Sequence, residues 1–259
     1  MGGGYVTRGA IDELVRHALS KMSHQHFVAN QMCHDCLVAL GESPAAIHIV
    51  GAPDLDLLTD IPAVTPHEFL PRYGIDPDRP FCLVTIHPEP RHPNLIHAID
   101  QCFTALSEVP CQLLITAPAP DPGAEYILQR IDQLCAQRED CHYHPSLGYS
   151  NYIQTMRLAH AMIGNTSSGI IEASFLGIPT IDIGDRQSGR LRGQHIIHCE
   201  WDARNIIHAI RKLDDPAFRH HICTPQTIYG DGHAAEKIYA ILKQLPATIP
   251  INKTFTPVK

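Results

Sequence analysis

From residue 80 onwards, short apolar segments alternate regularly with amphipathic segments of helical length. No other feature of the sequence limits the fold as strongly. Short, continuous apolar strands separated by helices are typical of a parallel sheet that is covered on both faces. Strands are expected at residues 82–86, 112–116, 141–144, 161–164 and 180–183, and helices at about residues 94–106, 124–137, 151–159, 168–176 and 203–213. The pattern predicts an α/β fold with one complete, doubly wound Rossmann-like domain.

The first 60 residues carry a shorter run of the same pattern. Helices are expected at about residues 10–22 and 30–40, and strands at residues 26–29 and 47–50. Residues 54–78 hold five Pro or Gly and five Asp, which is typical of a linker. We expect residues 1–60 to belong to an N-terminal Rossmann-like domain, 61–79 to be a linker, 80–245 to form the C-terminal domain, with a last helix at about 232–245, and 246–259 to be a tail.

Composition excludes several classes of protein. The formal net charge of −7 argues against a non-specific nucleic-acid binder, which needs a basic face. No run of 18 consecutive apolar residues is present, so no membrane span is expected. The nine cysteines are scattered and several lie in apolar runs, which favours reduced thiols and a cytoplasmic location. The CxxC at Cys33–Cys36 has no second pair at a zinc-site spacing, so neither a metal nor another cofactor is expected.

The fourth strand of the C-terminal domain leads into the segment Asn-Thr-Ser-Ser-Gly, in which Thr166, Ser167, Ser168 and Gly169 begin the next helix. Small residues at a strand-to-helix turn leave the first amides of the helix accessible, and the helix dipole favours an anion there. A diphosphate is the natural ligand of such a turn. Glu172, one turn later, could accept hydrogen bonds from sugar hydroxyls. An ordinary capped helix would have the same composition.

Two further features are expected at the same edge of the sheet. Residues 184–193 form a Gly-rich loop with three Arg, which could close over an anionic ligand or could simply be a solvated basic loop. His87 follows the first strand of the domain, where a histidine can also be structural. Because the carboxyl ends of parallel strands meet at one edge, these features and the Thr166–Gly169 turn are predicted to converge there.

Three segments together resemble hydrolysing UDP-N-acetylglucosamine 2-epimerases: IGNTSSGIIE at residues 163–172, GIPTIDIGDRQSGR at residues 177–190 and IYGDG at residues 228–232. These enzymes make N-acetylmannosamine for sialic-acid and related surface-sugar pathways. Residues 7–21 are also similar to a helix of the family's N-terminal domain. The resemblance covers nearly the whole chain, and the combination of segments is far more specific than a single Gly-rich loop.

The resemblance implies a GT-B fold, in which two Rossmann-like domains face each other and the C-terminal domain holds UDP. It implies these UDP-binding residues: Thr166, Ser167, Ser168 and Gly169 at the diphosphate, Glu172 at the ribose, Arg186 at the nucleotide and Leu147 beside the uracil. The implied catalytic residues are His87, near the diphosphate and sugar, and Asp12, near the sugar. The family reaction removes the C2 proton, eliminates UDP and adds water to the 2-acetamidoglucal.

The sequence also departs from the family pattern. Where relatives have an acidic-Gly-Gly-acidic turn, this chain has Met1-Gly2-Gly3-Gly4, and the strands that precede that turn in relatives have no counterpart. A position that contacts the nucleotide through a polar side chain in relatives is Ala119. We therefore expect impaired or absent turnover by this chain alone, with a homo-oligomer or a complementing N-terminal fragment as partner. A non-catalytic UDP-sugar-binding module and a GT-B glycosyltransferase half remain the alternatives.

Overall fold

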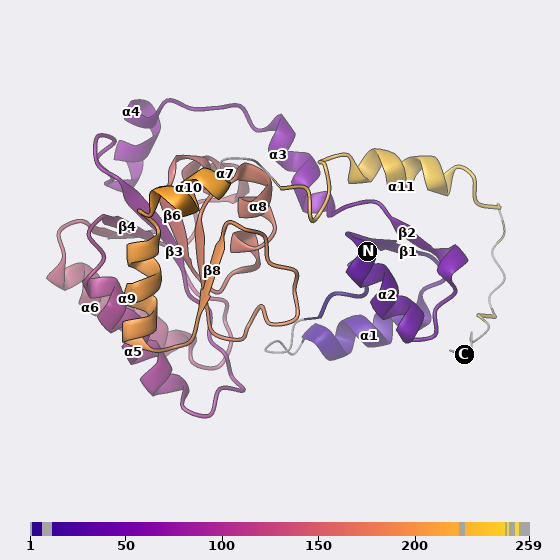
Figure 1. Ribbon diagram of the computed structural model, residues 1–259, viewed down its shortest axis with the longest axis horizontal. Coiled ribbons are helices and arrows are strands. Elements are labelled where there is room, and N and C mark those ends of the chain that lie inside the picture. The colour runs from indigo at the N-terminus through magenta and orange to yellow at the C-terminus, as the bar shows by residue number, and fades with distance from the viewer. Residues whose placement is uncertain (1, 7–11, 223–225, 247, 249–251, 254–259) are drawn as a thin grey trace.

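A computed structural model of the chain describes residues 2–6, 12–222, 226–246, 248 and 252–253. Its larger lobe is built on a sheet of six parallel strands in the order β5-β4-β3-β6-β7-β8 (Figure 1). The strands are β3 (Phe81–Thr85), β4 (Gln112–Ile115), β5 (Cys141–Tyr143), β6 (Ala161–Gly164), β7 (Thr180–Ile183) and β8 (Ile196–Cys199). The predicted α/β class with a doubly wound parallel sheet is thereby confirmed.

Helices cover both faces of this sheet. On one face pack α5 (Leu95–Ser107), α6 (Ala124–Gln137) and α9 (Ala203–Lys212), followed in the chain by α10 (Pro216–Ile222). On the other face pack α3 (Asp56–Asp60), α4 (Pro66–Phe69), η3 (Leu70–Tyr73), α7 (Tyr149–Leu158) and α8 (Glu172–Leu176). Successive side chains of a strand point to opposite faces of the sheet. Because helices cover both faces, the side chains on each face must be apolar. This explains why the strands read as continuous apolar runs.

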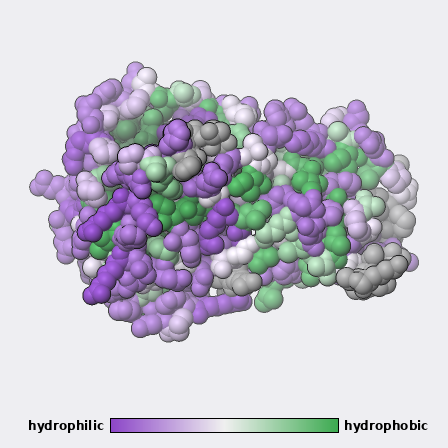
Figure 2. Space-filling model, viewed as in Figure 1, coloured by the Kyte–Doolittle hydropathy of each residue, from purple (hydrophilic) through white to green (hydrophobic). Residues whose placement is uncertain are grey.

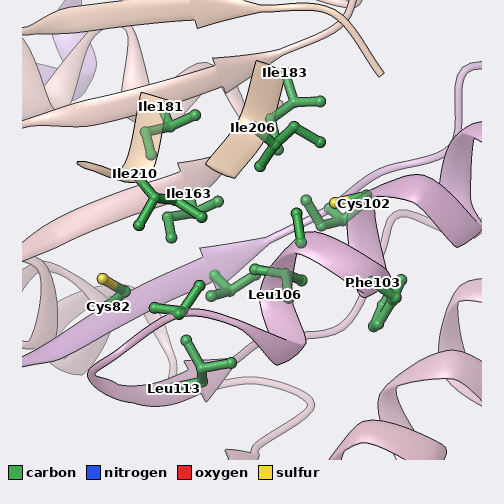
Figure 3. Close-up of a cluster of buried hydrophobic side chains, with 14 of the residues drawn as sticks. Cys82, Cys102, Phe103, Leu106, Leu113, Ile163, Ile181, Ile183, Ile206 and Ile210 are labelled. Atoms are coloured by element: carbon green, nitrogen blue, oxygen red, sulfur yellow. The ribbon is translucent and has the colours of Figure 1, made fainter. Parts of the chain in front are cut away.

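Figure 3 shows how the first of these faces is filled. Ile163 from β6 and Ile181 from β7 meet Ile206 and Ile210 from α9, while Leu106 of α5 lies over β3. All five side chains are buried. Burying such a side chain fully contributes about 1.5–3 kcal/mol relative to leaving it exposed, so this interface is a main source of stability for the larger lobe.

The smaller lobe contains a two-stranded parallel sheet, β1 (His26–Val28) and β2 (Ile47–Ile49). The helices α1 (Asp12–Met22) and α2 (Gln31–Ala39) precede and follow β1, and the short turns η1 (Pro44–Ala46) and η2 (Pro53–Leu55) flank β2. The last helix, α11 (Ala234–Leu242), lies on the side of this lobe in Figure 1. Asp56 fixes its start, because the Asp56 carboxylate accepts hydrogen bonds from the amides of Ala234 (2.8 Å) and Ala235 (2.6 Å).

The structure differs from the sequence-based expectations in several elements, among them the short helix α3 in the expected linker region. The strand β8 and the helix α10 were not expected. The helix expected at residues 168–176 is wrong as one element: a 3-10 turn, η4 (Ser167–Gly169), is followed by the five-residue α8. Within the part of the chain that the structure describes, no helix is long and apolar enough to cross a membrane.

Candidate functional site

The strands β3 and β6 are neighbours at the centre of the sheet, and successive crossovers leave from them in opposite directions. Such a reversal is where open parallel sheets bind ligands, beyond the carboxyl ends of the strands. At this edge β3 leads into His87, and β6 leads into Asn165 and the Thr166 turn. The predicted convergence of these segments is therefore observed.

Asn165 ties the two strand ends together. Its side chain is completely buried; Oδ1 accepts a hydrogen bond from the His87 amide (2.7 Å), and Nδ2 donates to the His87 carbonyl (2.9 Å). The Asn165 carbonyl accepts a hydrogen bond from Nε2 of Gln187 (2.9 Å) in the loop after β7. One residue thus positions three segments, and the sequence analysis did not identify it.

The His87 ring is held as a neutral hydrogen-bond donor. Its Nδ1 accepts a hydrogen bond from the Ala119 amide (2.9 Å), so the neutral ring carries its proton on Nε2. Burial, together with the positive charge of Arg186, lowers the pKa of His87 to about 4. Near neutral pH, Nε2 can therefore donate a hydrogen bond to an anion without the ring itself being charged. Ala119, which lacks a polar side chain, acts here through its backbone.

Glu89 organises the Arg-containing loop. This carboxylate is buried, and it accepts hydrogen bonds from the amides of Asp185 (3.3 Å) and Arg186 (3.0 Å). Gly184, with a φ of 73°, opens the loop, and a Cβ there would overlap the indole Nε1 of Trp201. The backbone of the loop is therefore fixed independently of any ligand. Glu89 was also absent from the residues predicted to form the site.

The Thr166 turn differs from the expected helix N-terminus. The Ser168 amide donates to Oγ1 of Thr166 (3.4 Å), and the Gly169 amide donates to the Thr166 carbonyl (3.3 Å). The expectation that these two amides are free is therefore wrong. Gly169 is buried against β7, where a Cβ would come within 2.8 Å of Cγ2 of Thr180, so packing sets the tight turn. The hydroxyl-bearing residues Thr166, Ser167 and Ser168 remain half-buried.

Tyr152 of α7 brings an unsatisfied hydroxyl to this turn. The Tyr152 hydroxyl lies next to the side chains of Thr85, Ser168 and Thr166, and burial raises its pKa to about 12. Its oxygen is buried and has no partner with hydrogen-bond geometry in the described chain. A buried hydroxyl without a partner is costly, which makes it a ready donor for a ligand atom. Tyr152 was not among the residues expected at the site.

Glu172 opens α8 beside the smaller lobe. Burial raises the pKa of the half-buried Glu172 carboxyl to about 7, and the nearby Asp54 carboxylate acts in the same direction. Arg190 and Ser168 act in the opposite direction. Tyr149 donates a hydrogen bond from its hydroxyl to the Asp54 carbonyl (2.9 Å), which joins α7 to η2. Glu172 therefore changes its protonation state close to neutral pH.

The three arginines of the loop have different surroundings. Arg186 donates from NH1 to the Asn165 carbonyl (3.4 Å) at the centre of the edge. Arg192 pairs with the buried Asp182 carboxylate at 2.8 Å and is structural. Arg190 lies 5.0 Å from the centroid of the Tyr5 ring, and its Nε and NH1 atoms are buried without a hydrogen-bond partner in the described chain. Arg186 and Arg190 are thus the loop arginines placed for an anionic ligand.

Comparison with known proteins places the chain in a family. Residues 1–243 match the sequence profile described as UDP-N-acetylglucosamine 2-epimerase. The chain belongs to this epimerase family.

Two members of the epimerase family are each about one-third identical to the chain over the aligned residues. It is 32% identical over 240 residues to a hydrolysing UDP-N,N'-diacetylbacillosamine 2-epimerase of Legionella pneumophila, covering 92% of this chain and 62% of that protein. It is 35% identical over 205 residues to a UDP-N-acetylglucosamine 2-epimerase of Neisseria meningitidis, covering 79% of this chain and 54% of that protein. The chain thus spans a little over half the length of these relatives.

Solved epimerase structures share the fold. The UDP-GlcNAc-bound 2-epimerase of N. meningitidis superposes with a TM-score of 0.78 at 17% identity, over 95% of this chain and 69% of that one. A 2-epimerase from Listeria monocytogenes gives a TM-score of 0.80 at 21% identity, over 94% of this chain and 65% of that one. The architecture is therefore GT-B-like, as the resemblance implied.

Of the residues that the epimerase resemblance implied, Leu147 lies apart from this constellation. Leu147 follows β5, the outermost strand on its side of the sheet; its side chain is buried in the core below α7, and its carbonyl accepts a hydrogen bond from Nδ2 of Asn151 (3.0 Å). The side chain of Asp12, the first residue of α1, lies outside the part of the chain that the structure describes.

Proposed function

We propose that this chain binds the UDP group of a UDP-2-acetamido sugar at the carboxyl edge of β3 and β6, as the nucleotide-binding half of a hydrolysing 2-epimerase. One observation carries the proposal: buried Asn165 joins the neutral Nε2 donor of His87 to the Thr166 turn and to the Arg186 loop. These donors all border one edge and were assembled from three distant segments. Such convergence suits a diphosphate, which accepts several hydrogen bonds at once.

We propose the following contacts with the ligand. The hydroxyls of Thr166, Ser167 and Ser168 and the guanidinium of Arg186 bind the diphosphate. Glu172 accepts hydrogen bonds from the ribose hydroxyls, and the Leu147 segment borders the uracil. The Gly169 amide already donates to the Thr166 carbonyl, so it is not a proposed ligand donor. Gly169 supports the site by letting the turn pack closely on β7.

The proposed reaction needs an acid–base pair and a stabilised leaving group. Removal of the C2 proton and cleavage of the C1–O bond release UDP and leave a 2-acetamidoglucal. Addition of water then gives the free sugar with inverted C2, N-acetylmannosamine when the substrate is UDP-N-acetylglucosamine. His87 hydrogen-bonds the departing UDP through Nε2, which spreads the charge that develops on its oxygen. The carboxylates that move protons at the sugar come from the N-terminal side, where Asp12 is the candidate.

We propose that the catalytic half of the site also requires residues from a second polypeptide. The chain covers 62% and 54% of two relatives, so each has a large part with no counterpart here. We propose that residues 1–60 are part of the N-terminal domain and that 80–245 form the UDP-binding domain. Turnover by this chain alone is then impaired or absent, and a complementing N-terminal fragment restores it. A homo-oligomer is the second form in which the site could be completed.

The relatives are named for different sugar nucleotides. Two are named for UDP-N,N'-diacetylbacillosamine, one of them also for the GDP sugar, and another is named for UDP-N-acetylglucosamine. All these sugars carry a 2-acetamido group, whose neighbouring C2 proton the reaction removes. UDP-N-acetylglucosamine is the first substrate to test, and a sialic-acid or related surface-sugar pathway of the cytoplasm is the proposed setting.

Calorimetric titration with UDP, beside an NMR assay for free N-acetylmannosamine, tests the proposal. We expect UDP to bind this chain and ADP to bind far more weakly, with little or no product. Product should appear when the N-terminal part of a full-length relative is added, and in D2O it should carry deuterium at C2. Failure to bind UDP contradicts the proposal, and rapid turnover by the chain alone contradicts the impaired state. Binding that no added fragment converts to turnover favours the non-catalytic module, and sugar transfer to an acceptor favours the glycosyltransferase half.

A further inference from the structure

Two cysteines lie together at the opposite, amino edge of the larger sheet. Cys135 is in the last turn of α6 and Cys141 is the first residue of β5, and their sulfur atoms are 3.1 Å apart. Cys141 is buried, whereas Cys135 is half-buried. Two thiols that already point toward each other at this separation can bond with little movement of the backbone.

The turn between the two cysteines is held rigidly. Arg138 donates hydrogen bonds to the carbonyls of Leu106 (2.9 Å), Val109 (3.0 Å) and Cys111 (2.9 Å), and to the Asp140 carboxylate (3.0 Å). These bonds fix the end of α6 and the start of β5 relative to each other. The sulfur pair is therefore a stable feature of the fold.

The two sulfur atoms have unequal chemistry. A hydrogen bond from Cys141 lowers the pKa of the Cys135 thiol, against the effect of burial, and the same bond raises the pKa of Cys141. The thiolate is the nucleophilic form of cysteine. Cys135, which is the more accessible and the more acidic, is thus placed to react first, with Cys141 beside it to resolve the product.

We propose that Cys135 and Cys141 form a peroxide-sensitive dithiol that closes to a disulfide between α6 and β5. The Cys135 thiolate attacks one peroxide oxygen, forming a sulfenic acid and releasing hydroxide, which takes up a proton to become water. The sulfur of Cys141 then attacks the sulfenic sulfur; its proton and the departing hydroxyl leave as water. In total, two thiols and one hydrogen peroxide give one disulfide and two waters.

A second sulfur pair provides an internal comparison. The sulfur atoms of Cys82 and Cys111 are 3.0 Å apart, but both residues are buried in the core beneath α5. Oxidation requires access to the oxidant, so this pair should react more slowly than Cys135 and Cys141. The disulfide at Cys135 forms at the amino ends of the strands, away from the proposed nucleotide edge, and should leave UDP affinity unchanged.

The test uses the whole folded chain, first reduced, then treated with hydrogen peroxide and blocked with N-ethylmaleimide. Trypsin cuts after Arg138, between the two cysteines, so the disulfide appears as residues 131–138 linked to residues 139–157. We expect this linked pair to be the first product, with the intact mass lower by about 2 Da. In Cys141→Ser, Cys135 should instead gain about 32 Da as the sulfinic acid, because it has no resolving thiol.

Cys36→Ser is the matched control, since Cys36 is a half-buried thiol on α2, and it should form the linked pair like the parent chain. The proposal is overturned if peroxide leaves residues 131–138 and 139–157 unlinked. It is equally overturned if the link forms only after urea has unfolded the chain, because the folded geometry would then have no part in it.

Discussion

His87 and Glu172 ionise in an unusual range for their residue types. Burial and the charge of Arg186 lower the pKa of His87 to about 4, so its ring is neutral near pH 7. Burial raises the pKa of Glu172 to about 7. A neutral imidazole donates a hydrogen bond to phosphate without acquiring a proton of its own. A carboxyl with a pKa near 7, by contrast, must lose its proton before both of its oxygens act purely as acceptors of hydrogen bonds from two sugar hydroxyls.

The pKa of Glu172 predicts the pH dependence of binding. Affinity for UDP-N-acetylglucosamine, whose diphosphate diester does not titrate near neutrality, should rise as the pH increases from 6 to 8, because the carboxylate form becomes dominant. Glu172→Gln should bind more weakly at pH 8 and show a flat profile. Calorimetry across this range is the measurement, and an identical slope in the variant would remove Glu172 from the ribose contact.

Arg186→Ala should weaken UDP binding by about 10- to 100-fold, the range for losing a hydrogen bond between charged groups. The fold should persist, because Glu89 holds the Arg186 amide and not its side chain. Arg211→Ala, which removes an exposed arginine of α9, is the control and should bind like the parent chain. Unchanged affinity in Arg186→Ala would exclude this side chain from the site.

Because of His195, we expect the stability of the fold around the Thr166 turn to fall in acid. Its Nε2 donates a hydrogen bond to the Gly169 carbonyl (3.0 Å), and burial lowers its pKa to about 4. The unfolded chain therefore binds the proton more readily, so stability is complete above the unfolded pKa of about 6.5 and is lost as the pH falls from there toward 4.

The contribution of His195 to the free energy of unfolding between pH 7 and pH 4 is on the order of 3 kcal/mol. Urea unfolding of the parent chain and of His195→Gln at both pH values measures it. The parent should lose that much more stability than the variant, in which the amide can still donate to Gly169 but does not titrate. Equal losses in the two proteins would contradict the assignment.

At the scale of secondary-structure elements, the site depends on links between segments far apart in the chain. Asn165 at the end of β6 satisfies both backbone groups of His87, and Glu89 satisfies two amides of the loop after β7. The proposed ligand contacts lie on turns, but buried side chains at the strand ends position those turns. This is a preorganised arrangement, which favours binding because little ordering remains to be done.

Asn165→Ala should lower the free energy of unfolding by about 3 kcal/mol, because it leaves the amide and carbonyl of His87 without their partners. UDP binding should fall as well, since the Thr166 turn and the Arg186 loop lose a common anchor. Asn151→Ala is a suitable comparison, because among the described residues its side chain bonds only the Leu147 carbonyl. Urea titration of both variants decides the matter: equal, small losses would show that Asn165 is not the anchor.

Burial explains why the central strands of the larger sheet were predicted. The strands β3, β4, β6 and β7 are buried along their whole length and were predicted from their apolar runs. The edge strand β8 is only partly buried and contains an exposed His198, so it lacked that signal. The helix expected at residues 168–176 is interrupted at Gly169, which lies close to Thr180 of β7, and no local pattern reveals this tertiary proximity.

The proposed ligand-binding residues came from motif and resemblance, whereas the residues that position them did not. Asn165 and Glu89 act on backbone groups 78 to 97 residues away, so their roles depend on the three-dimensional fold. Tyr152 lay on an expected helix and carried no motif. Its proximity to Ser168 became visible only once α7 was placed beside the turn.

At the scale of the whole molecule, the two lobes are unequally packed. The smaller lobe has a two-stranded sheet, and α1 exposes a row of apolar side chains, among them Leu14 (67% exposed) and Met22 (77%). Hydrophobic residues are visible on the surface of this lobe in Figure 2. Apolar surface of this kind marks a site of interaction. It is consistent with the proposed need for an N-terminal fragment or a second copy.

Limited trypsin digestion should therefore cut the smaller lobe first. We expect early cleavage at Arg16 and Lys21 in α1, and late cleavage at Arg130 and Arg138 in and after α6, because α1 exposes apolar side chains whereas α6 buries its own in the core. A complementing fragment that restores activity should also slow cleavage in α1. Equal rates in the two lobes would contradict the expected difference in stability.

The central claim is that the carboxyl edge of β3 and β6 holds a nucleotide diphosphate. A crystal structure of the chain with UDP tests it most directly. We expect phosphate oxygens within hydrogen-bond distance of the Ser167 or Ser168 hydroxyl, the Arg186 guanidinium and Nε2 of His87. A nucleotide bound elsewhere on the chain, with this edge left empty at saturating UDP, would contradict the account.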